Sequence, residues 1–148
     1  MIIRPACPQD LDAWAQLRFD LWPDESSAAE HRAEAAQTLE QPETFATFVA
    51  ETPDGAIAGF IEAALRHDYV NGCETSPVAF IEGLYVRPAY RKAEVGRSLC
   101  AAVADWGRAM GCAELASDAL ADNAESHAFH QAVGFEETER VVYFRMGL

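Results

Sequence analysis

Residues 80–99, FIEGLYVRPAYRKAEVGRSL, decide the fold, because a strand, a basic loop and a helix follow one another within them. The apolar run at residues 78–86 predicts the strand. The loop after it carries Arg91 and Lys92 and leads into a helix whose first backbone N–H groups lack partners within the helix. The helix dipole adds partial positive charge there. A loop of this kind at a helix start predicts a seat for a phosphate group.

Composition limits the classes of partner. The chain has 148 residues, half of them hydrophobic, which suits one domain with a substantial core. Its 24 acidic residues against 11 Lys and Arg give a formal net charge of −13. Nucleic acid is a poor partner for this surface, because its phosphates need clustered Lys and Arg. A cationic small molecule would be attracted, although solubility alone explains the charge equally well.

The cysteines and the N-terminus bear on the cell compartment. Cys7, Cys73, Cys100 and Cys112 show no C-x-x-C spacing, so we expect no metal site and a reducing cytoplasm. No stretch approaches the roughly 18 apolar residues of a membrane span. The first residues also lack the charged start and apolar block of a signal peptide. We therefore expect a cytoplasmic protein without a membrane partner.

The hydrophobic pattern predicts one domain, residues 1–148, with elements in the order β-α-α-β-β-β-α-β-α-β. Helical spacing is clearest for Val95, Leu99 and Val103, in a helix that Gly111 would end. The order implies an α/β mixed sheet with helices on both faces and parallel strands around the basic loop. The expected strands are 2–4, 45–51, 57–65, 78–86, 114–117 and 135–146, and the expected helices are 11–21, 28–40, 95–110 and 124–133.

Three further segments carry a likeness that spans nearly the whole chain: Leu21-Trp22-Pro23, residues 67–83 (HDYVNGCETSPVAFIEG) and residues 130–141 (HQAVGFEETERV). With the element order, they resemble the bacterial aminoglycoside 6′-N-acetyltransferases of the GNAT superfamily. The superfamily's pyrophosphate loop reads Arg/Gln-x-x-Gly-x-Gly/Ala; Arg91 and Gly96 match it, and Glu94 stands where the first Gly is expected. The resemblance implies the GNAT acyltransferase fold with a splayed central strand pair. It also implies acetyl transfer from acetyl-CoA to an antibiotic amine.

The resemblance assigns the acetyl-CoA site to main-chain groups of strand 78–86, to the loop after it and to the start of a later helix. These residues are Leu84, Tyr85, Val86, Lys92, Ala93, Glu94, Val95, Gly96, Arg97 and Asn123. An ordinary strand–loop–helix would look the same in sequence, and Asn123 equally suits a helix N-cap. The Glu94 carboxylate would repel a pyrophosphate, but we expect the neighbouring cations to offset this and binding to survive.

The acid–base chemistry requires a carboxylate, because a sugar amine is mostly protonated near neutral pH and must lose a proton before it attacks. Glu82 interrupts an apolar strand, and Asp118 follows the next strand at the sheet edge where α/β ligands gather. An Arg-paired Glu82 and a helix-capping Asp118 are the structural alternatives. The resemblance puts both in the aminoglycoside pocket with Glu139, Trp22 and Tyr69, although the two aromatics equally suit core packing.

The departing CoA thiolate needs a proton, and many members of the superfamily place a tyrosine where this chain has His130. A histidine can donate a proton, whereas a thiolate with a pKa of about 8.5 needs little help; Tyr143 is a more remote candidate. The resemblance also gives the Leu84 N–H as an oxyanion donor, direct attack in a ternary complex, and a homodimer through the C-terminal strands. A GNAT enzyme for a polyamine or amino sugar and a non-catalytic acyl-CoA-binding domain remain alternatives.

Overall fold

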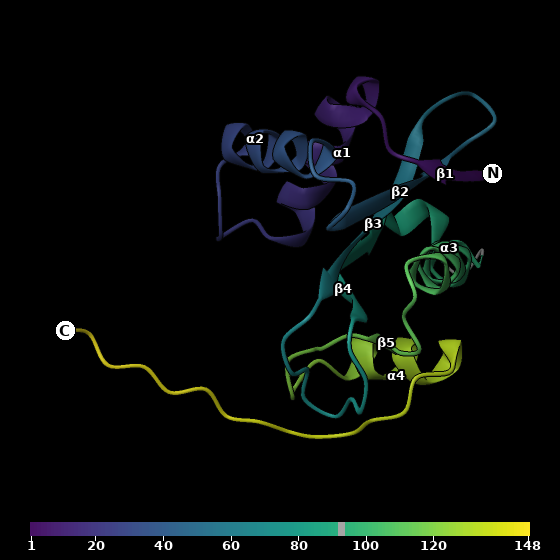
Figure 1. Cartoon of the computed structure of the whole chain (residues 1–148). Coiled ribbons are helices and arrows are strands. Elements are labelled where there is room, and N and C mark those ends of the chain that lie inside the picture. The colour runs from purple at the N-terminus through teal and green to yellow at the C-terminus, as the bar shows by residue number, and fades with distance from the viewer. Residues whose placement is uncertain (92–93) are drawn as a thin grey trace.

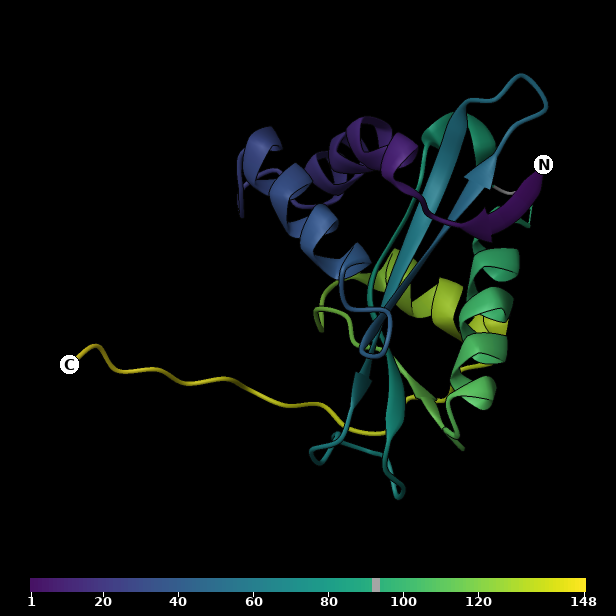
Figure 2. The same cartoon turned by 45° about the horizontal axis from the view of Figure 1, so that its top comes forward.

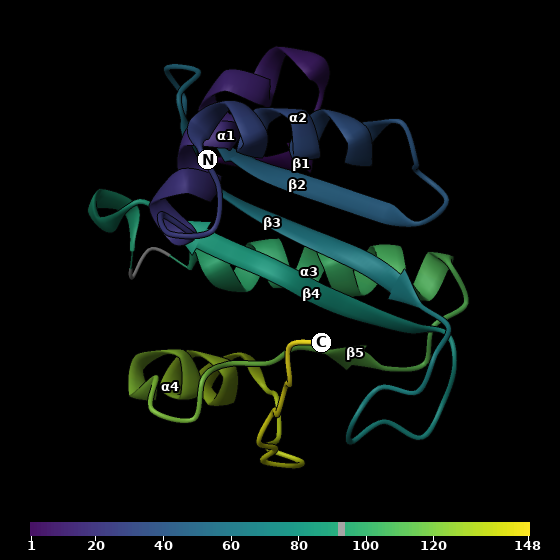
Figure 3. The same cartoon turned by 90° about the vertical axis from the view of Figure 1, so that its left-hand side faces the viewer.

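The computed structural model describes residues 1–91 and 94–148. Its centre is a five-stranded sheet in the order β1-β2-β3-β4-β5, antiparallel from β1 to β4 and parallel between β4 and β5. Figure 3 shows the strands side by side in this order. The strands are β1 (Ile2–Pro5), β2 (Phe45–Glu51), β3 (Ile57–Arg66), β4 (Val78–Val86) and β5 (Leu115–Ala116).

Helices cover both faces of the sheet (Figure 1). On one face lie α1 (Leu11–Leu21) and α2 (Ala28–Leu39); on the other lies α3 (Val95–Ala109), with α4 (Ala124–Val133) beside β5. Short 3₁₀ helices at Pro8–Asp10 and Pro88–Tyr90 precede α1 and the loop before α3. In the part of the chain that the structure describes, no helix has both the length and the apolar surface that crossing a bilayer would require.

Two apolar clusters hold these layers together. The stripe of α3 buries Leu99 and Val103 completely against the sheet, as its helical spacing predicts. On the opposite face, Trp14 and Leu17 of α1 are buried with Phe60 of β3. Burial of each such side chain contributes about 1.5–3 kcal/mol, so the sheet is held firmly between its two helical layers.

The beginning of α1 is held by an ion pair instead of a helix cap. Asp10 stands at the N-cap position of α1, but its side chain does not bond the helix. Its carboxylate accepts hydrogen bonds from Arg4 Nη1 and Nη2 at 2.8 and 2.9 Å and from the Cys7 N–H at 2.8 Å. The Arg4 hydrogen bonds lower the pKa of Asp10. This ion pair ties β1 to α1.

The helices and the first five strands agree with the sequence predictions to within two residues at each end. Glycines end two of the helices in the left-handed region, Gly111 at φ +87° and Gly134 at φ +117°.

The sixth predicted strand, residues 135–146, is wrong: no strand follows α4 among the described residues. Phe135 packs on the core, but the segment after it extends away from the body as an arm (Figures 1 and 2). A strand needs a neighbouring edge to bond to, and the arm has left the sheet.

Candidate active site

A cleft of about 760 Å³ opens where β4 and β5 separate. The two strands pair only at Ala79–Leu115 and Phe80–Ala116, and beyond these pairs they diverge. Figure 3 shows β5 beside one end of β4 and α4 beside the other end. Among the residues that line the cleft are Trp22, Glu82, Leu84, Tyr85, Val86, Glu94, Val95, Gly96, Arg97, Asp118 and Asn123. The divergence therefore brings together most of the residues that the sequence assigns to cofactor and substrate.

A β-bulge sets the direction of Glu82. Across the β3–β4 ladder Ile81 faces Ala63 and Gly83 faces Glu62, so Glu82 is an extra residue without a partner. Its carboxylate is partly exposed and accepts hydrogen bonds from Arg66 Nη2 at 2.9 and 3.0 Å. The sequence placed Glu82 in an apolar run, where a carboxylate is costly. The bulge resolves this, because it turns the side chain away from the core and toward Arg66.

Gly83, the next residue, is in close contact with Trp22. A Cβ atom at Gly83 would overlap the Trp22 ring, so only glycine fits there. Trp22 follows the last residue of α1 and lines the cleft with Leu21. It is half-buried, so it both packs on the strand and presents a face to the cleft. Trp22 thus packs on Gly83, directly beside Glu82, which is the candidate base on β4.

The backbone of β4 after the bulge offers hydrogen-bonding groups to the cleft. The Arg87 N–H bonds the carbonyl of Ala58 in β3 at 2.8 Å. Because N–H groups alternate in direction along a strand, Tyr85 also faces β3, whereas Leu84 and Val86 face the side from which β5 has departed. On that side Arg91 Nε donates to the Val86 carbonyl at 2.8 Å. Leu84 and Val86 can therefore bond an extended ligand along this edge.

The basic loop meets α3 at a strained residue. Glu94 has φ +62°, in the left-handed region, which costs about 1 kcal/mol or more for a residue with a side chain. Its carboxylate pairs with Arg97 Nε at 2.7 Å, and both side chains are exposed. Arg97 Nη2 also donates to the Ala132 carbonyl at 2.6 Å. Lys92 and Ala93, two expected cofactor contacts, lie outside the described residues.

Packing between α3 and α4 requires a glycine at position 96, in addition to its place in the pyrophosphate-loop motif. A Cβ at Gly96 would lie 2.8 Å from the Phe129 ring of α4, so glycine lets the two helices approach closely at the cleft. Val95 before it is buried in the core as the first residue of α3. The close approach of α3 and α4 places the free N–H groups of α3 at the end of the cleft.

The wall of the cleft opposite β4 contains Asp118 and Asn123. It also contains a hydrogen-bonded pair, Ser117 and His130, that the sequence did not predict. Asn123 caps α4, because its side-chain oxygen accepts the Ser126 N–H at 3.1 Å. His130 Nδ1 donates to the Ser126 carbonyl at 2.7 Å, and its Nε2 accepts the Ser117 hydroxyl at 2.8 Å. Both ring nitrogens of His130 are therefore engaged within this wall of the cleft. The sequence signal for Ser117 was its position at the end of the expected strand 114–117.

Three expected residues do not line the cleft. Tyr69 lies in the loop between β3 and β4 with 74% of its surface exposed. Glu139 and Tyr143 lie on the arm, where both are exposed. For this single chain the expectation that Tyr69 and Glu139 stand in the substrate pocket is not met, because the loop and the arm extend away from the cleft.

Cys100 is the cysteine that lines the cleft. Burial raises the pKa of its thiol to about 11, and Arg97 offsets this only in part. The thiolate is the nucleophilic form of cysteine, so Cys100 stays protonated and inert near neutral pH. The cleft therefore suits direct transfer between two bound substrates.

Comparison with known proteins identifies this architecture. The model of the acetyltransferase (GNAT) family matches residues 11–135. The chain belongs to the GNAT acetyltransferase family. Two GNAT relatives named aminoglycoside N(6′)-acetyltransferase type 1 are similar to it. The one from Stenotrophomonas maltophilia is 55% identical over 99% of this chain and 93% of its own, and the one from Salmonella typhimurium is 47% identical over 98% of each.

Solved GNAT structures support the same assignment. AAC(6′)-Iy in complex with the bisubstrate analogue CoA-S-monomethyl-acetylneamine has a TM-score of 0.92 and 44% identity, covering 99% of this chain and 98% of its own. AAC(6′)-Ig from Acinetobacter haemolyticus has a TM-score of 0.93 and 42% identity, covering 100% and 99%. The sequence-based prediction of the GNAT fold is confirmed.

The strain and the charge at Glu94 can be tested separately. Glu94→Ala removes the carboxylate and keeps a side chain at positive φ, whereas Glu94→Gly removes both. We expect both variants to bind CoA several-fold more tightly in calorimetry, because a negative charge leaves the helix start. We expect only Glu94→Gly to gain about 1 kcal/mol in urea unfolding. Glu43→Ala, far from the cleft, is the control, and an unchanged CoA Kd in both variants would contradict the charge effect.

Proposed function

We propose that this chain is an acetyl-CoA-dependent aminoglycoside 6′-N-acetyltransferase that inactivates the antibiotic and so confers resistance. The observation that carries the proposal is the match, over nearly the whole chain, to relatives of that name and to a solved structure holding a CoA–aminoglycoside analogue. The cleft supports it, because one side offers strand backbone and a helix start to a cofactor. The other side offers carboxylates and an aromatic ring to a cationic sugar.

The cofactor side would bind acetyl-CoA through Leu84 and Val86 along the β4 edge and through the start of α3. Free N–H groups and the dipole at a helix start suit a pyrophosphate. Arg91 and Arg97 add positive charge beside that start. Asn123, which caps α4, adds a polar group on the opposite wall. The proposal also includes Val95 and Gly96 at this helix start and the loop residues Lys92, Ala93 and Glu94. Tyr85 lines the cleft, but its backbone N–H faces β3, so the main-chain contact that the resemblance implies for Tyr85 is not part of the proposal.

The substrate side would bind the ammonium groups of an aminoglycoside. Glu82 and Asp118 supply negative charge from β4 and from the end of β5, and Trp22 supplies an apolar face for a sugar ring. The net charge of −13 favours the approach of a polycation. The same charge makes a nucleic-acid partner unfavourable.

In the reaction, the Glu82 carboxylate takes a proton from the bound 6′-ammonium, directly or through one water. The neutral amine attacks the thioester carbonyl, and the Leu84 N–H stabilises the oxyanion that forms. The C–S bond then breaks, and the second proton of the amine passes to the departing thiolate, directly or through one water. His130 has both ring nitrogens engaged by Ser126 and Ser117, so the proposal gives it no acid role. A CoA thiolate has a pKa of about 8.5, so it needs no dedicated acid.

We further propose a cytoplasmic homodimer of one-domain chains, joined through the C-terminal arm. The arm, residues 136–148, exposes Val142, Tyr143, Phe144 and Met146, each with more than three quarters of its surface in solvent. Such an apolar segment is typical of an interaction site, and an extended segment pairs readily with the edge of another sheet. A second copy supplies such an edge and the same arm in return.

The enzymatic proposal is tested with kanamycin, which has a 6′-amine, and paromomycin, which has a hydroxyl there. We expect release of CoA thiol from acetyl-CoA with kanamycin and none with paromomycin. Turnover of both antibiotics would show that the acetylated amine is not the 6′-amine. Spermidine with a higher kcat/KM than kanamycin would favour a polyamine enzyme. Tight binding of acetyl-CoA without turnover on any amine would favour a non-catalytic domain.

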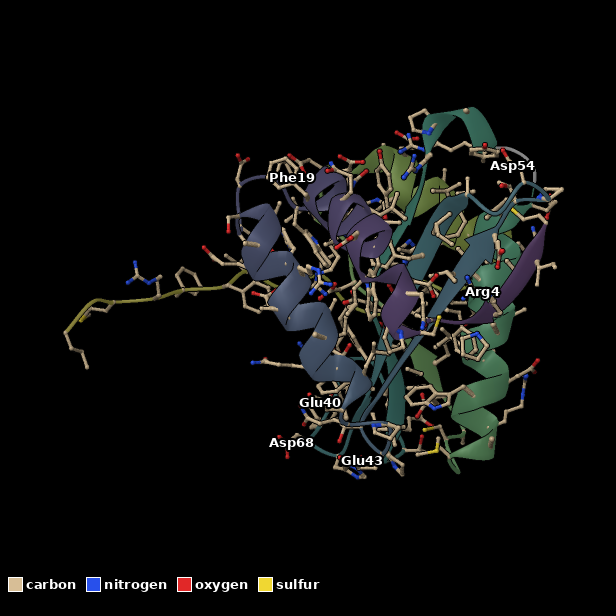
Figure 4. All side chains as sticks on the ribbon, turned by 90° about the horizontal axis from the view of Figure 1, so that it is seen from above. Arg4, Phe19, Glu40, Glu43, Asp54 and Asp68 are labelled. Carbon is tan, nitrogen blue, oxygen red and sulfur yellow. The ribbon has the colours of Figure 1, made fainter. Side chains whose placement is uncertain are left out.

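The role of Glu82 predicts a change in pH dependence. Glu82→Gln removes the base, so we expect kcat to fall about 10²–10⁴-fold, most strongly at low pH, where deprotonation of the amine is hardest. The measurement is a kcat profile from pH 6 to pH 9 with kanamycin. Glu40→Gln is the matched control, because Glu40 is exposed at the end of α2 and does not line the cleft (Figure 4). A profile of unchanged shape would remove Glu82 from the base role.

The dimer predicts the size of the protein in solution. We expect light scattering to give twice the 16.2 kDa chain mass for the wild type. We expect Phe144→Ser to shift the protein toward monomer. Leu120→Ser is the control, because Leu120 is an apolar side chain exposed to a similar degree outside the arm. A wild-type monomer would refute the dimer and leave the enzymatic proposal standing.

A further inference from the structure

A buried ion pair, formed by Arg18 and Glu62, lies next to Trp22. Glu62 of β3 and Arg18 of α1 are each less than a tenth exposed. Arg18 Nη1 donates to both carboxylate oxygens of Glu62, and Trp14 Nε1 donates to one of them at 2.7 Å. Burial raises the pKa of Glu62, and the Arg18 charge and these hydrogen bonds oppose that rise. The ion pair thus joins α1 to β3 at Glu62, which faces Gly83 across the β3–β4 ladder.

Arg18 continues from this ion pair to His31 of α2. Its Nε lies 3.3 Å from His31 Nδ1, and its Nη2 pairs with Glu34. Because a guanidinium can only donate, Nδ1 of His31 accepts, and its proton is on Nε2. Nε2 donates to the Trp22 carbonyl at 3.2 Å. Neutral His31 in this tautomer therefore links the buried ion pair to the backbone of Trp22.

The His31 ring also contacts the Trp22 side chain. The two rings stack with centroids 6.3 Å apart and an interplanar angle of 20°. Phe19 meets the other side of the histidine edge-on at 6.3 Å, where α1 approaches α2 (Figure 4). The Arg18 guanidinium lies 5.1 Å from the centre of the Trp22 ring. His31 is 1% exposed, so none of these contacts is shared with solvent.

These contacts form a closed ring through the molecule. Glu62 faces Gly83 across the ladder, Arg18 and His31 lead from Glu62 to Trp22, and the Trp22 ring packs on Gly83. Glu82 and Leu84, the candidate base and the candidate oxyanion donor, stand on either side of Gly83. Stability alone does not require a charged group here, because apolar side chains of similar volume often serve as well.

We propose that His31 is a positioning residue, which holds Trp22 against the bulge of β4 and so shapes the amine end of the substrate site. The inference rests on the proposed function, because it assigns Trp22 to the aminoglycoside pocket. His31 touches neither substrate nor cofactor. It acts by fixing the Trp22 backbone with one hydrogen bond and the Trp22 ring by stacking. The acetyl-CoA edge, Leu84 to Val86, does not contact His31 and is not expected to respond.

Two substitutions separate the hydrogen bonds from the stacking. His31→Phe keeps a ring and removes both hydrogen bonds, whereas His31→Gln keeps a donor and an acceptor and removes the ring. We expect His31→Phe to raise the kanamycin KM about tenfold, since a small misplacement at a site is costly. We expect its acetyl-CoA KM to stay within about twofold of wild type. His31→Gln should recover part of the kanamycin KM.

A second readout does not depend on turnover. In an NMR spectrum of the indole N–H groups, the Trp22 signal is identified by its loss in Trp22→Phe. We expect this signal to shift or broaden in His31→Phe while the signal of Trp106, which lies in α3 on the other face of the sheet, keeps its position. If the wild type fails to acetylate any aminoglycoside, the proposed function fails, and the Trp22 signal still decides whether His31 positions this side chain.

Ala35→Gly is the matched control, because Ala35 is a fully buried residue of the same helix outside the ring of contacts. It should lower Tm and leave both KM values and the Trp22 signal unchanged. The proposal is overturned if His31→Phe leaves the kanamycin KM and the Trp22 signal unchanged. It is also overturned if both KM values rise together in His31→Phe, as a general loss of structure would cause.

Discussion

The two hydrogen-bonded sides of β4 behave differently, and the active site depends on that difference. Toward β3 the strand is paired along its length, with one extra residue at Glu82. Toward β5 it is paired only at Ala79 and Phe80 and is then left open. The paired side holds the strand rigidly, so the open side can present Leu84 and Val86 to a ligand without reorganisation. Preorganised donors of this kind are what a transition state with developing negative charge requires.

The rest of the fold supports this strand from both faces. α3 packs its apolar stripe below the sheet and brings its free N–H groups to one end of the cleft. On the other face, Trp22 at the end of α1 packs on Gly83 between the candidate base and the candidate oxyanion donor. The cofactor side and the sugar side thus meet along three consecutive residues of one strand. A bound acyl group and an amine would meet there without an acyl-enzyme.

Sequence patterns predicted the strands up to β5 and all four helices, because periodicity and glycine stops are local signals. The resemblance to the acetyltransferase family, and not periodicity, named most of the residues that line the cleft. The direction of Glu82 was not predictable, since a bulge depends on the register of two strands. The partners of His130 and His31 come from other elements, so spacing along the chain does not indicate them. The arm was misread as a strand because its apolar run, residues 141–144, suits any sheet edge, including that of another molecule.

The open edge of β4 is tested most directly by amide hydrogen exchange at single residues, with and without saturating acetyl-CoA. Tyr85, which faces β3, is the internal reference and should exchange slowly in both states. The account predicts that Leu84 and Val86 exchange readily in the free protein and slow by at least about tenfold with acetyl-CoA, because they then bond the ligand. Unchanged exchange at Leu84 and Val86 with acetyl-CoA bound would contradict it and place the cofactor elsewhere.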